Sequence, residues 1–407
     1  MKCQLTFPGN KLSGTVKLPV SKSMSSRLLV INAMGNLGLD LTSVSDSKDT
    51  QTLRKLLSSK DHKLDVLDGG TTARFLIAYL AATCRPAIVT GTSRMQKRPV
   101  LELVEALSQL GAEITFLQDP GSLPIQIHPT PLKGNSVSMR GDISSQFISA
   151  LLLVAPTLKN GLAITLVGDI VSKPYIGMTL AMMRHYGITC GWDGNTIKVD
   201  PGSYVKNTPL LEKDWSAASY WYSMVALSPM AEITLLGLEA ESLQGDSVVR
   251  NIFSNLGVET NFISTGCRIT KSQIQIEPFA FDFSDCPDLA QTVITTCAAM
   301  GIPSSFSGLS TLAIKETNRV AALKQELAKL NVTIKGAGES AVELLPGREA
   351  LGTQLSFCTY SDHRMAMALS ALCMRHSVTI DDPGVVAKSY PSFWREMEQA
   401  GIVIKPA

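Results

Sequence analysis

A basic, serine-rich stretch near the start of the chain carries the first residues whose chemistry points to a ligand. Residues 21–27 read Ser-Lys-Ser-Met-Ser-Ser-Arg and run into an apolar segment that ends at Gly35. Pro19 disfavours helix at the residue before it, so we expect a helix from about Lys22 that stops at Gly35, its left-handed C′ residue. Unpaired N–H groups of the first turn, beside Lys22 and Arg27, form an anion-binding arrangement. A capped amphipathic helix with solvated cations explains the same residues equally well.

Hydroxyl groups, glycines and cations also stand where other helices are expected to begin. These positions are residues 69–74, 94–99, 144–146, 172–175, 285–288, 315–319, 361–364 and 388–389. If they face one another, their cations converge although the net charge of the chain is only +2. Because arginine forks bind carboxylate and phosphate bidentately and lysine supplies point charge, the predicted ligand is a small polyanion. The converging cations are Lys22, Arg27, Arg98, Lys315, Arg319, Arg364 and Lys388.

Each of these positions also has a purely structural explanation. Ser144 and its neighbours are more often a helix cap than a ligand site, and Asp288 stabilises a helix N-terminus by about 0.3–1 kcal/mol without any function. Arg364 fits a surface residue, and Glu316 a solvated charge, equally well. The glycines at 69–70 match neither the dinucleotide-binding nor the P-loop spacing, so nucleotide binding is not supported.

Composition and cysteine usage limit the classes to which the chain can belong. Its 407 residues are more than one hydrophobic core usually stabilises, so two domains are expected. A content of 45% hydrophobic and 18% charged residues fits a soluble globular protein. No apolar run reaches the ~18 residues of a membrane helix and no signal-peptide core is recognised, so we expect a cytoplasmic protein. The eight cysteines form no Cys-x-x-Cys pair, which favours a reducing compartment without structural zinc. The near-neutral charge gives no case for nucleic acid.

Five helix ends share one pattern, in which a helix runs into a small residue and then a strand. The small residues are Gly111, Gly187, Gly257, Asn331 and Gly401, at intervals of 76, 70, 74 and 70 residues. Gly or Asn suits a left-handed C′ position, where a Cβ is usually costly. The near-constant period indicates one supersecondary unit used repeatedly.

Each period reads as strand, helix, strand, helix and two further strands. The expected helices are 72–82, 99–110, 144–155, 174–186, 216–226, 247–256, 289–300, 316–330, 363–373 and 392–400, and a strand is expected at 311–314. Only 48 residues separate Lys22 from Gly70, so the first of six units is abbreviated, with 61–67 as its only candidate for terminal strands. The prediction is an α/β protein with buried helices and two domains of three units, 20–212 and 213–407, the second joined by 1–19.

Taken together and in this order, these segments resemble the 5-enolpyruvylshikimate-3-phosphate synthase family. The matching stretches span nearly the whole chain and are 21–27, 70–74, 94–99, 144–146, 172–175, 287–288, 315–319, 360–367 and 387–388. The resemblance implies a two-domain inside-out α/β barrel of six βαβαββ units, with the active site in the interdomain cleft. It also implies a monomer without cofactor or metal.

The resemblance further implies a transferase of chorismate and aromatic amino-acid biosynthesis. It would move the enolpyruvyl group of phosphoenolpyruvate to the 5-hydroxyl of shikimate 3-phosphate and release phosphate. The residues implied for phosphoenolpyruvate are Lys22, Gly70, Arg98, Gln146, Arg319, Arg364 and Lys388. Those implied for shikimate 3-phosphate are Lys22, Ser23, Arg27, Ser144, Ser145, Gln146, Ser172, Tyr175, Asp288 and Lys315.

The implied reaction needs an acid and a base whose roles reverse between its two steps. Adding an alcohol to an enol ether carbon requires protonation of the methylene group and removal of the hydroxyl proton, and the tetrahedral adduct then expels phosphate. The candidates are Asp288, Glu316 and Lys22, and we assign the hydroxyl base to Asp288. The cations would stabilise charge on the leaving phosphate, which requires no metal.

Several positions depart from the family pattern. Ser26 stands where the family usually has Asn, and Asp68-Gly69 replaces the more usual Asn-Ala. Thr311 occupies a position where some members use Asn for the substrate, so that contact is not carried over. The abbreviated first unit is the largest departure, and it concerns the packing of that unit rather than the site.

Two other functions are open to a chain of this kind. The related enolpyruvyl transferase that acts on UDP-N-acetylglucosamine relies on a cysteine in the loop before its Arg-Pro, and residues 91–99 contain none. A non-catalytic anion-binding relative would keep the cations and lose activity. The joint presence of four residues argues against it: Lys22, Asp288, Glu316 and Arg319.

Overall fold

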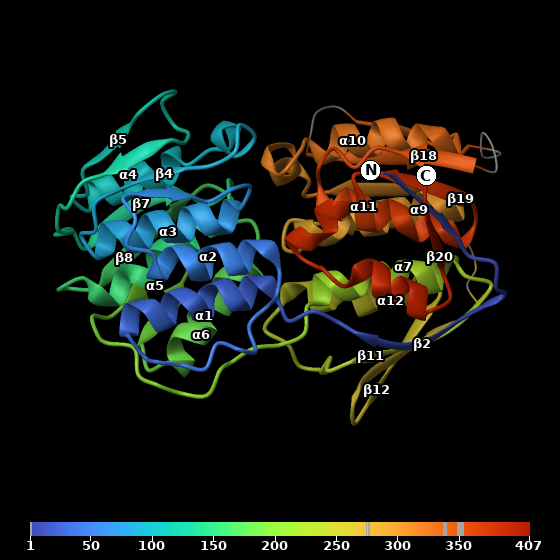
Figure 1. The fold of residues 1–407 in the computed structure, drawn as a ribbon, viewed down its shortest axis with the longest axis horizontal. Helices are drawn as coiled ribbons and strands as arrows, with labels where there is room; N and C mark the ends of the chain where they lie inside the picture. Colours follow the sequence, from blue (N-terminus) through green and yellow to red (C-terminus); the bar gives the residue numbers. More distant parts are fainter. Residues whose placement is uncertain (1, 274, 276, 337–339, 348–353) are drawn as a thin grey trace. The chain divides into compact units, whose positions relative to one another are not determined.

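The computed structural model describes residues 2–273, 275, 277–336, 340–347 and 354–407. The chain divides into two compact units, drawn in Figure 1. Val20–Leu211 form the N-terminal unit, and Met1–Pro19 with Glu212–Ala407 form the C-terminal unit. Both units consist of four-stranded sheets and of helices.

The N-terminal unit contains two sheets with the strand orders β3-β4-β6-β5 and β7-β8-β10-β9. In each, the first two strands are parallel and the last two are antiparallel, which is the βαβαββ arrangement that the repeat predicts. The strands are β3 (Lys63–Asp65), β4 (Ala87–Thr90), β5 (Ile114–Phe116), β6 (Ile125–Ile127), β7 (Ser136–Arg140), β8 (Leu162–Val167), β9 (Cys190–Asp193) and β10 (Thr196–Val199).

The described residues of the C-terminal unit form three sheets with the orders β12-β13-β11-β2, β14-β15-β17-β16 and β18-β19-β1-β20. The strands are β1 (Lys2–Thr6), β2 (Lys11–Lys17), β11 (Met230–Leu236), β12 (Val258–Ile263), β13 (Gly266–Lys271), β14 (Phe279–Asp282), β15 (Ser304–Ser307), β16 (Thr333–Lys335), β17 (Val342–Leu345), β18 (Gln354–Phe357), β19 (Ser377–Asp381) and β20 (Val403–Pro406). β1 pairs with β19 and β20, and β2 pairs with β11. The first strands of the chain therefore complete two sheets built mainly from its last 200 or so residues.

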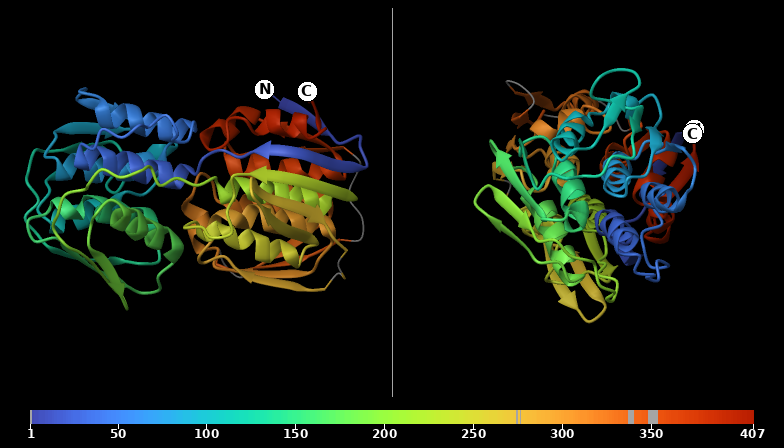
Figure 2. Two further views of the ribbon diagram at one scale, coloured as in Figure 1. Left: turned by 90° about the horizontal axis from the view of Figure 1, so that it is seen from below. Right: turned by 90° about the vertical axis from the view of Figure 1, so that its left-hand side faces the viewer.

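The helices lie inside each unit and the sheets lie outside (Figure 2). They are α1 (Lys22–Gly35), α2 (Lys48–Ser58), α3 (Gly70–Ala82), α4 (Leu101–Gln109), α5 (Ser145–Val154), α6 (Lys173–His185), α7 (Trp215–Leu227), α8 (Val249–Ser254), α9 (Ala290–Met300), α10 (Arg319–Leu327), α11 (His363–Ser370) and α12 (Phe393–Gln399). In α7, 12 of 13 residues are buried, as expected of a helix that is apolar on all sides. Among the described residues, no helix is both long and apolar enough to cross a membrane.

The first unit is abbreviated, as predicted, and what it lacks is its own sheet. Within 20–65, all of which is described, the regular elements are α1, α2 and the short β3. β3 pairs in parallel with β4, so it opens the sheet of the second unit. The expectation that 61–67 would supply terminal strands of the first unit was therefore wrong.

The left-handed residues at the five repeated helix ends are confirmed. Gly111, Gly187, Gly257, Asn331 and Gly401 have φ of 103°, 86°, 79°, 58° and 96°. At the end of α1, by contrast, the predicted position was wrong by one residue, because Asn36 is left-handed with φ 48°.

Gly35 is the last helical residue. Glycine is required there because a Cβ has no room, and not because of its backbone angles. A Cβ at this position would lie 2.7 Å from Cδ2 of Leu37 and 2.8 Å from Cβ of Tyr204. The contact with Tyr204 joins α1 to a segment far along the chain, so sequence spacing alone did not reveal it.

The type of one other predicted element and the starts of two predicted helices were wrong. The expected strand 311–314 is part of a 3₁₀ helix, η5 (Ser310–Ile314), because β15 has already ended before Gly308, where φ is +70°. The helix expected from 316 begins at Arg319, where Asn318 caps α10 by accepting from the Ala321 amide at 3.0 Å. The helix expected from 99 begins at Leu101.

We predict that Gly35→Ala lowers the free energy of unfolding by about 1–3 kcal/mol, because the new methyl group overpacks the contact between α1 and Tyr204. Urea denaturation followed by circular dichroism measures the change.

Gly177→Ala is the matched control, since Gly177 lies inside α6 and a Cβ there meets nothing within 4 Å. It should leave stability unchanged or raise it by about 0.5–1 kcal/mol. Equal stability of the two variants would contradict the packing role of Gly35.

Candidate active site

Helix N-termini hold the predicted site residues of the N-terminal unit. Lys22 begins α1, Gly70 begins α3 and Ser145 begins α5. Ion pairs and hydrogen bonds join these helix starts to one another. Helix N-terminal ends and basic side chains therefore share one region, which is the setting in which proteins bind anions.

The Lys22 ammonium has a buried partner that the sequence did not indicate. Its Nζ lies 3.2 Å from Oδ2 of Asp49 in the first turn of α2, and the two side chains are 14% and 7% exposed. The Asp49 carbonyl also accepts a hydrogen bond from Oγ1 of Thr72, in the first turn of α3, at 3.0 Å. Asp49 therefore connects the starts of α1, α2 and α3 and positions Lys22 among them.

Two guanidinium groups pack against the start of α3. A Cβ added to Gly70 would lie 2.5 Å from Nη1 of both Arg74 and Arg98, so glycine is what leaves room for them. Arg74 donates to Oε1 of Gln146 at 3.1 Å and to the Pro99 carbonyl at 2.8 Å. The structure thus brings together three residues that were predicted to hold phosphoenolpyruvate. It adds Arg74, which the sequence offered only as part of a motif.

Arg27 is buried among helices and makes four hydrogen bonds there. It donates to Oγ1 of Thr179 at 2.7 Å, to Oγ of Ser149 at 3.0 Å and to the carbonyls of Ser23 and Tyr175 at 2.9 and 3.0 Å. Burial lowers the pKa of the Arg27 guanidinium to about 10. In this structure Arg27 links α1 to α5 and α6, and its contact with substrate stays a prediction.

The hydroxyl residues predicted for shikimate 3-phosphate stand at the starts of α5 and α6. Oγ of Ser144 accepts from the Gln146 amide at 3.3 Å, which confirms its capping role. Ser172 is buried and precedes α6 with φ 56°, a left-handed conformation that is uncommon for serine. Ser145 is buried and Tyr175 half-buried in the first turns of these helices. Strained residues such as Ser172 occur preferentially at ligand sites.

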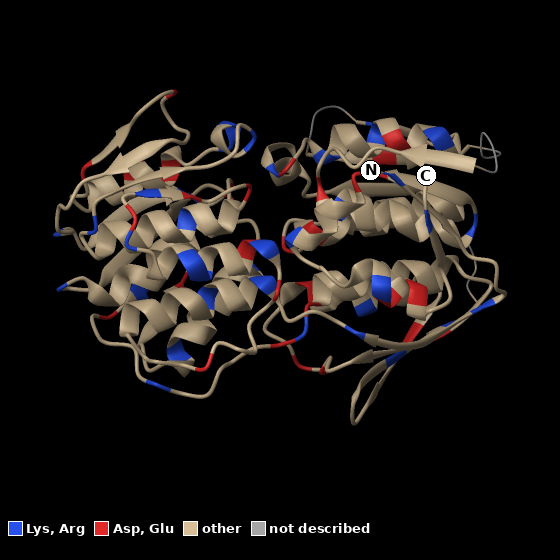
Figure 3. Cartoon of the chain, viewed as in Figure 1, with Lys and Arg blue, Asp and Glu red and all other residues tan. Residues whose placement is uncertain are grey.

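Acidic and basic residues gather at the N-terminal ends of helices in the C-terminal unit, where the ribbon of Figure 3 is coloured both red and blue. We name six of them the carboxylate–cation cluster: Asp288, Glu316, Arg319, Asp362, Arg364 and Lys388. Arg319 is its centre, with 1% of its side chain exposed. Its guanidinium lies 2.8 Å from Asp362, 3.0 Å from Glu316 and 3.4 Å from Asp288.

Two of the carboxylates each bridge Arg319 to a second cation. Oδ2 of Asp288 lies 2.6 Å from Nη2 of Arg364, and Oε1 of Glu316 lies 3.2 Å from Nζ of Lys388. These contacts connect η4 (Pro287–Leu289), α10, α11 and η8 (Pro383–Lys388). Five of the predicted residues therefore meet, and Lys315, also predicted, lies next to Glu316 in the chain.

Electrostatics keep the centre of this cluster charged. Burial alone would lower the pKa of Arg319, but the three carboxylates around it raise that pKa above its usual value. Tyr220 OH accepts a hydrogen bond from Arg364 at 3.3 Å, and burial raises the pKa of Tyr220 to about 12. The phenol is therefore neutral near pH 7 and serves as an uncharged neighbour of Arg364.

Sequence reasoning missed Asp49, Asp362 and Tyr220 as members of these groups. Asp362 had a detectable signal, since it caps α11 by accepting from the Arg364 amide at 2.9 Å and stands inside a matching motif. Asp49 and Tyr220 had none, because their partners lie 27 and 144 residues away.

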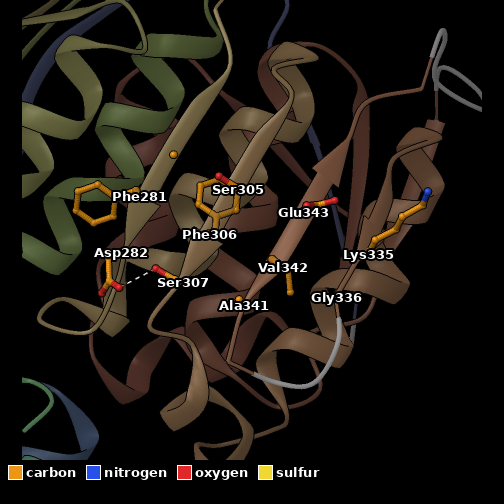
Figure 4. Close-up of a pocket in the computed structure, with 11 residues that line it drawn as sticks. Phe281, Asp282, Ser305, Phe306, Ser307, Lys335, Gly336, Ala341, Val342 and Glu343 are labelled. Atoms are coloured by element: carbon orange, nitrogen blue, oxygen red, sulfur yellow. Dashed lines mark hydrogen bonds between the residues drawn. The ribbon is translucent and has the colours of Figure 1, made fainter. Parts of the chain in front are cut away.

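A separate cavity of about 740 Å³ lies on the β14-β15-β17-β16 sheet (Figure 4). It is lined by Ala280, Phe281, Asp282, Ser305, Phe306, Ser307, Lys335, Gly336, Ala341, Val342 and Glu343. Oδ2 of Asp282 accepts from Ser307 at 2.7 Å. The predicted site residues are not part of this lining.

Comparison with known proteins assigns the chain to a family. Residues 54–397 match the model of the family described as EPSP synthase (3-phosphoshikimate 1-carboxyvinyltransferase). A Bacteroides fragilis protein named 3-phosphoshikimate 1-carboxyvinyltransferase is 43% identical over 408 residues, covering 100% of this chain and 99% of its own. A Haemophilus influenzae protein of the same name is 32% identical and covers 96% of this chain and 97% of its own.

The fold also matches solved structures. An EPSP synthase structure from Acinetobacter baumannii superposes with a TM-score of 0.79 at 19% identity, and the match covers 100% of both chains. At this identity the likeness concerns the fold alone. It agrees with the two-domain α/β architecture that the repeat predicted.

We predict that Gln291→Met raises the free energy of unfolding by about 1–3 kcal/mol, because an unsatisfied buried amide is replaced by an apolar group of similar length. Gln291 is 0% exposed on α9, and neither Nε2 nor Oε1 has a hydrogen-bond partner within the part of the chain that the structure describes. Chemical denaturation measures the difference.

Gln4→Met is the control, since Nε2 of Gln4 donates to Oγ of Ser377 at 2.9 Å. It should lower stability by about 0.5–1.5 kcal/mol. A Gln291→Met variant less stable than the parent would show that the amide is satisfied in solution.

Proposed function

The chain belongs to the EPSP synthase (3-phosphoshikimate 1-carboxyvinyltransferase) family, and we propose that the helix N-termini of its two units carry out the family's reaction together. The reaction transfers the enolpyruvyl group of phosphoenolpyruvate to the 5-hydroxyl of shikimate 3-phosphate and releases phosphate, as a step of aromatic amino-acid biosynthesis. The carboxylate–cation cluster carries the proposal, because it combines carboxylates that can move protons with cations that suit phosphorylated, carboxylated substrates.

Residues of both units hold phosphoenolpyruvate in this proposal. They are Lys22, Gly70, Arg98, Gln146, Arg319, Arg364 and Lys388. The packing of two guanidinium groups against Gly70 supports this assignment, because it concentrates positive charge at the N-terminal end of α3. Arg74 holds Gln146 in place through its 3.1 Å hydrogen bond.

The second substrate, shikimate 3-phosphate, binds mainly through hydroxyl groups and cations. The residues proposed for it are Lys22, Ser23, Arg27, Ser144, Ser145, Gln146, Ser172, Tyr175, Asp288 and Lys315. Ser172 supports this assignment, since its left-handed backbone directly before α6 has an energetic cost, and such conformations occur preferentially at functional sites.

Binding of the donor frees carboxylates for proton transfer. Arg364 and Lys388 are held by Asp288 and Glu316, and the carboxylate and phosphate groups of phosphoenolpyruvate compete for the same cations. When the donor takes these cations, Asp288 and Glu316 lose one partner each and become better proton acceptors. The cluster therefore couples donor binding to activation of the base.

Asp288 then removes the proton of the 5-hydroxyl as that oxygen attacks the carbon of phosphoenolpyruvate that bears the phosphate group. Glu316 or Lys22 protonates the methylene group, and the tetrahedral adduct forms. In the second step the roles reverse, and phosphate leaves while Arg319 and the other cations stabilise its negative charge.

The enzyme works as a monomer in the cytoplasm under this proposal. The monomer follows from the family resemblance. A reducing compartment is supported by the cysteines, all eight of which are free thiols. Light scattering coupled to size-exclusion chromatography measures the oligomeric state directly.

The direct test of the reaction is phosphate release from phosphoenolpyruvate with shikimate 3-phosphate as acceptor, and with UDP-N-acetylglucosamine in parallel. Release with the shikimate compound alone is expected. Release with the nucleotide sugar, or release with neither acceptor while both substrates still bind, would contradict the proposed function.

Lys22→Met should lower kcat/KM by at least about 100-fold, because it removes a half-buried charge that we place at the reacting groups. Steady-state kinetics measure this loss. Lys55→Met, on the exposed side of α2, is the control and should be neutral. Near-normal rates for Lys22→Met would remove Lys22 from the site.

Asp288→Asn should lower kcat by about 10²–10⁴-fold, since asparagine keeps the shape of the side chain but cannot accept the hydroxyl proton. Glu316→Gln, measured beside it, separates the two carboxylates. A larger loss in kcat for Glu316→Gln, with Asp288→Asn below tenfold, would exchange their assignments.

A further inference from the structure

We propose that Glu326 is a positioning residue, which acts through Tyr360 to hold a strained segment that fixes Asp362 against Arg319. The inference rests on the proposed function, because it concerns how Arg319 is presented to phosphoenolpyruvate. Glu326 contributes no contact to the carboxylate–cation cluster among those found in the described residues. Its effect must therefore reach the site through the segment 358–362.

This segment contains two consecutive residues in a costly conformation. Tyr360 and Ser361 have φ of 54° and 53°, which non-glycine residues adopt uncommonly and mostly one at a time. Such a pair persists only where the surrounding structure holds it in place. It lies directly before Asp362, which caps α11 and binds Arg319.

Glu326 supplies that constraint from α10. Its side chain is 0% exposed, and Oε1 accepts from Tyr360 OH at 2.6 Å. Oε2 accepts from the Cys358 amide at 3.0 Å and from Nζ of Lys329 at 2.6 Å. Burial and the Glu326 carboxylate raise the pKa of Tyr360, so the phenol remains a donor. One carboxylate therefore binds both Tyr360, a member of the strained pair, and the Cys358 amide, two residues before it.

A second carboxylate completes the constraint from the neighbouring strand. Oδ1 of Asp381, at the end of β19, accepts from the Thr359 amide at 2.6 Å. The Thr359 carbonyl accepts from the Asp362 amide at 2.9 Å. These bonds direct Asp362 toward the start of α11.

The helix α10 contacts the segment at two points. Arg319 and Glu326 are seven residues apart, about two helical turns, and so lie on one side of α10. Arg319 binds Asp362 at 2.8 Å while Glu326 binds Tyr360. The distance between Arg319 and Glu326 along the helix thus sets where Asp362 meets Arg319. Loss of the Glu326 contact lets the strained pair relax and turns Asp362 away from the guanidinium.

Tyr360→Phe tests the inference, since it removes the hydroxyl and keeps the ring. The KM for phosphoenolpyruvate should rise about tenfold, as expected when a hydrogen bond to a charged group no longer positions the site, while kcat changes by less than about threefold. Tyr204→Phe is the control, because it loses a buried hydroxyl bonded to the Leu153 carbonyl at 2.9 Å in the N-terminal unit. Its KM should equal that of the parent.

The discriminating variant is Tyr360→Phe combined with Ser361→Gly. Glycine adopts positive φ without strain, so the double variant should return the KM to within about threefold of the parent. A KM unaffected by Tyr360→Phe would overturn the inference. So would a raised KM that Ser361→Gly does not restore, since the hydroxyl would then act directly and not through the strain.

Hydrogen–deuterium exchange gives a readout that is independent of activity. Peptides covering 358–364 should exchange at least about tenfold faster in Tyr360→Phe and return toward the parental rate in the double variant. A parent enzyme that releases no phosphate would overturn the proposed function, and exchange would still test the constraint. Unchanged exchange in Tyr360→Phe would overturn the constraint itself.

Discussion

The buried guanidinium of Arg319 is the interaction on which the site depends. Moving such a charge out of water costs several kcal/mol, and carboxylates offset that cost only with good geometry. Asp288, Glu316 and Asp362 provide this geometry at 3.4, 3.0 and 2.8 Å. Each belongs to a different segment, so the ends of three helices must come together for Arg319 to be buried at all. Folding of the C-terminal unit and assembly of the carboxylate–cation cluster are therefore one event.

The same physical problem is solved in both units. Parallel inner helices place their N-termini together, where the macrodipole already favours anions and opposes cations. Basic side chains at these ends need acidic partners in the absence of substrate, and Asp49 for Lys22 and Asp288 for Arg364 are such partners. Under the proposed function, anionic substrates take the place of these carboxylates. The ion pairs keep the basic side chains paired until then.

The abbreviated first unit shows which parts of the repeat the function requires. The outer layer is what this unit lacks, since β3 belongs to the sheet of the second unit. The inner helix α1, which carries Lys22 and Arg27, remains complete and has a side-chain cap from Ser21. Because the substrate-binding residues that we propose stand on the inner helices, the missing sheet removes outer support and leaves these residues in place.

The sequence by itself determined the repeat, the α/β class, the left-handed turns and the positions of the cations. Local sterics explain the turns, for example, because residues such as Gly187 and Asn331 tolerate the positive φ that these turns need. Only the tertiary structure decided which carboxylate accompanies each cation, why Gly35 has no side chain, and that Glu326 binds Tyr360 and Cys358. Those properties depend on neighbours brought from far along the chain, such as Tyr204 beside Gly35, and on burial, which turns an ordinary charge into one that must be paired.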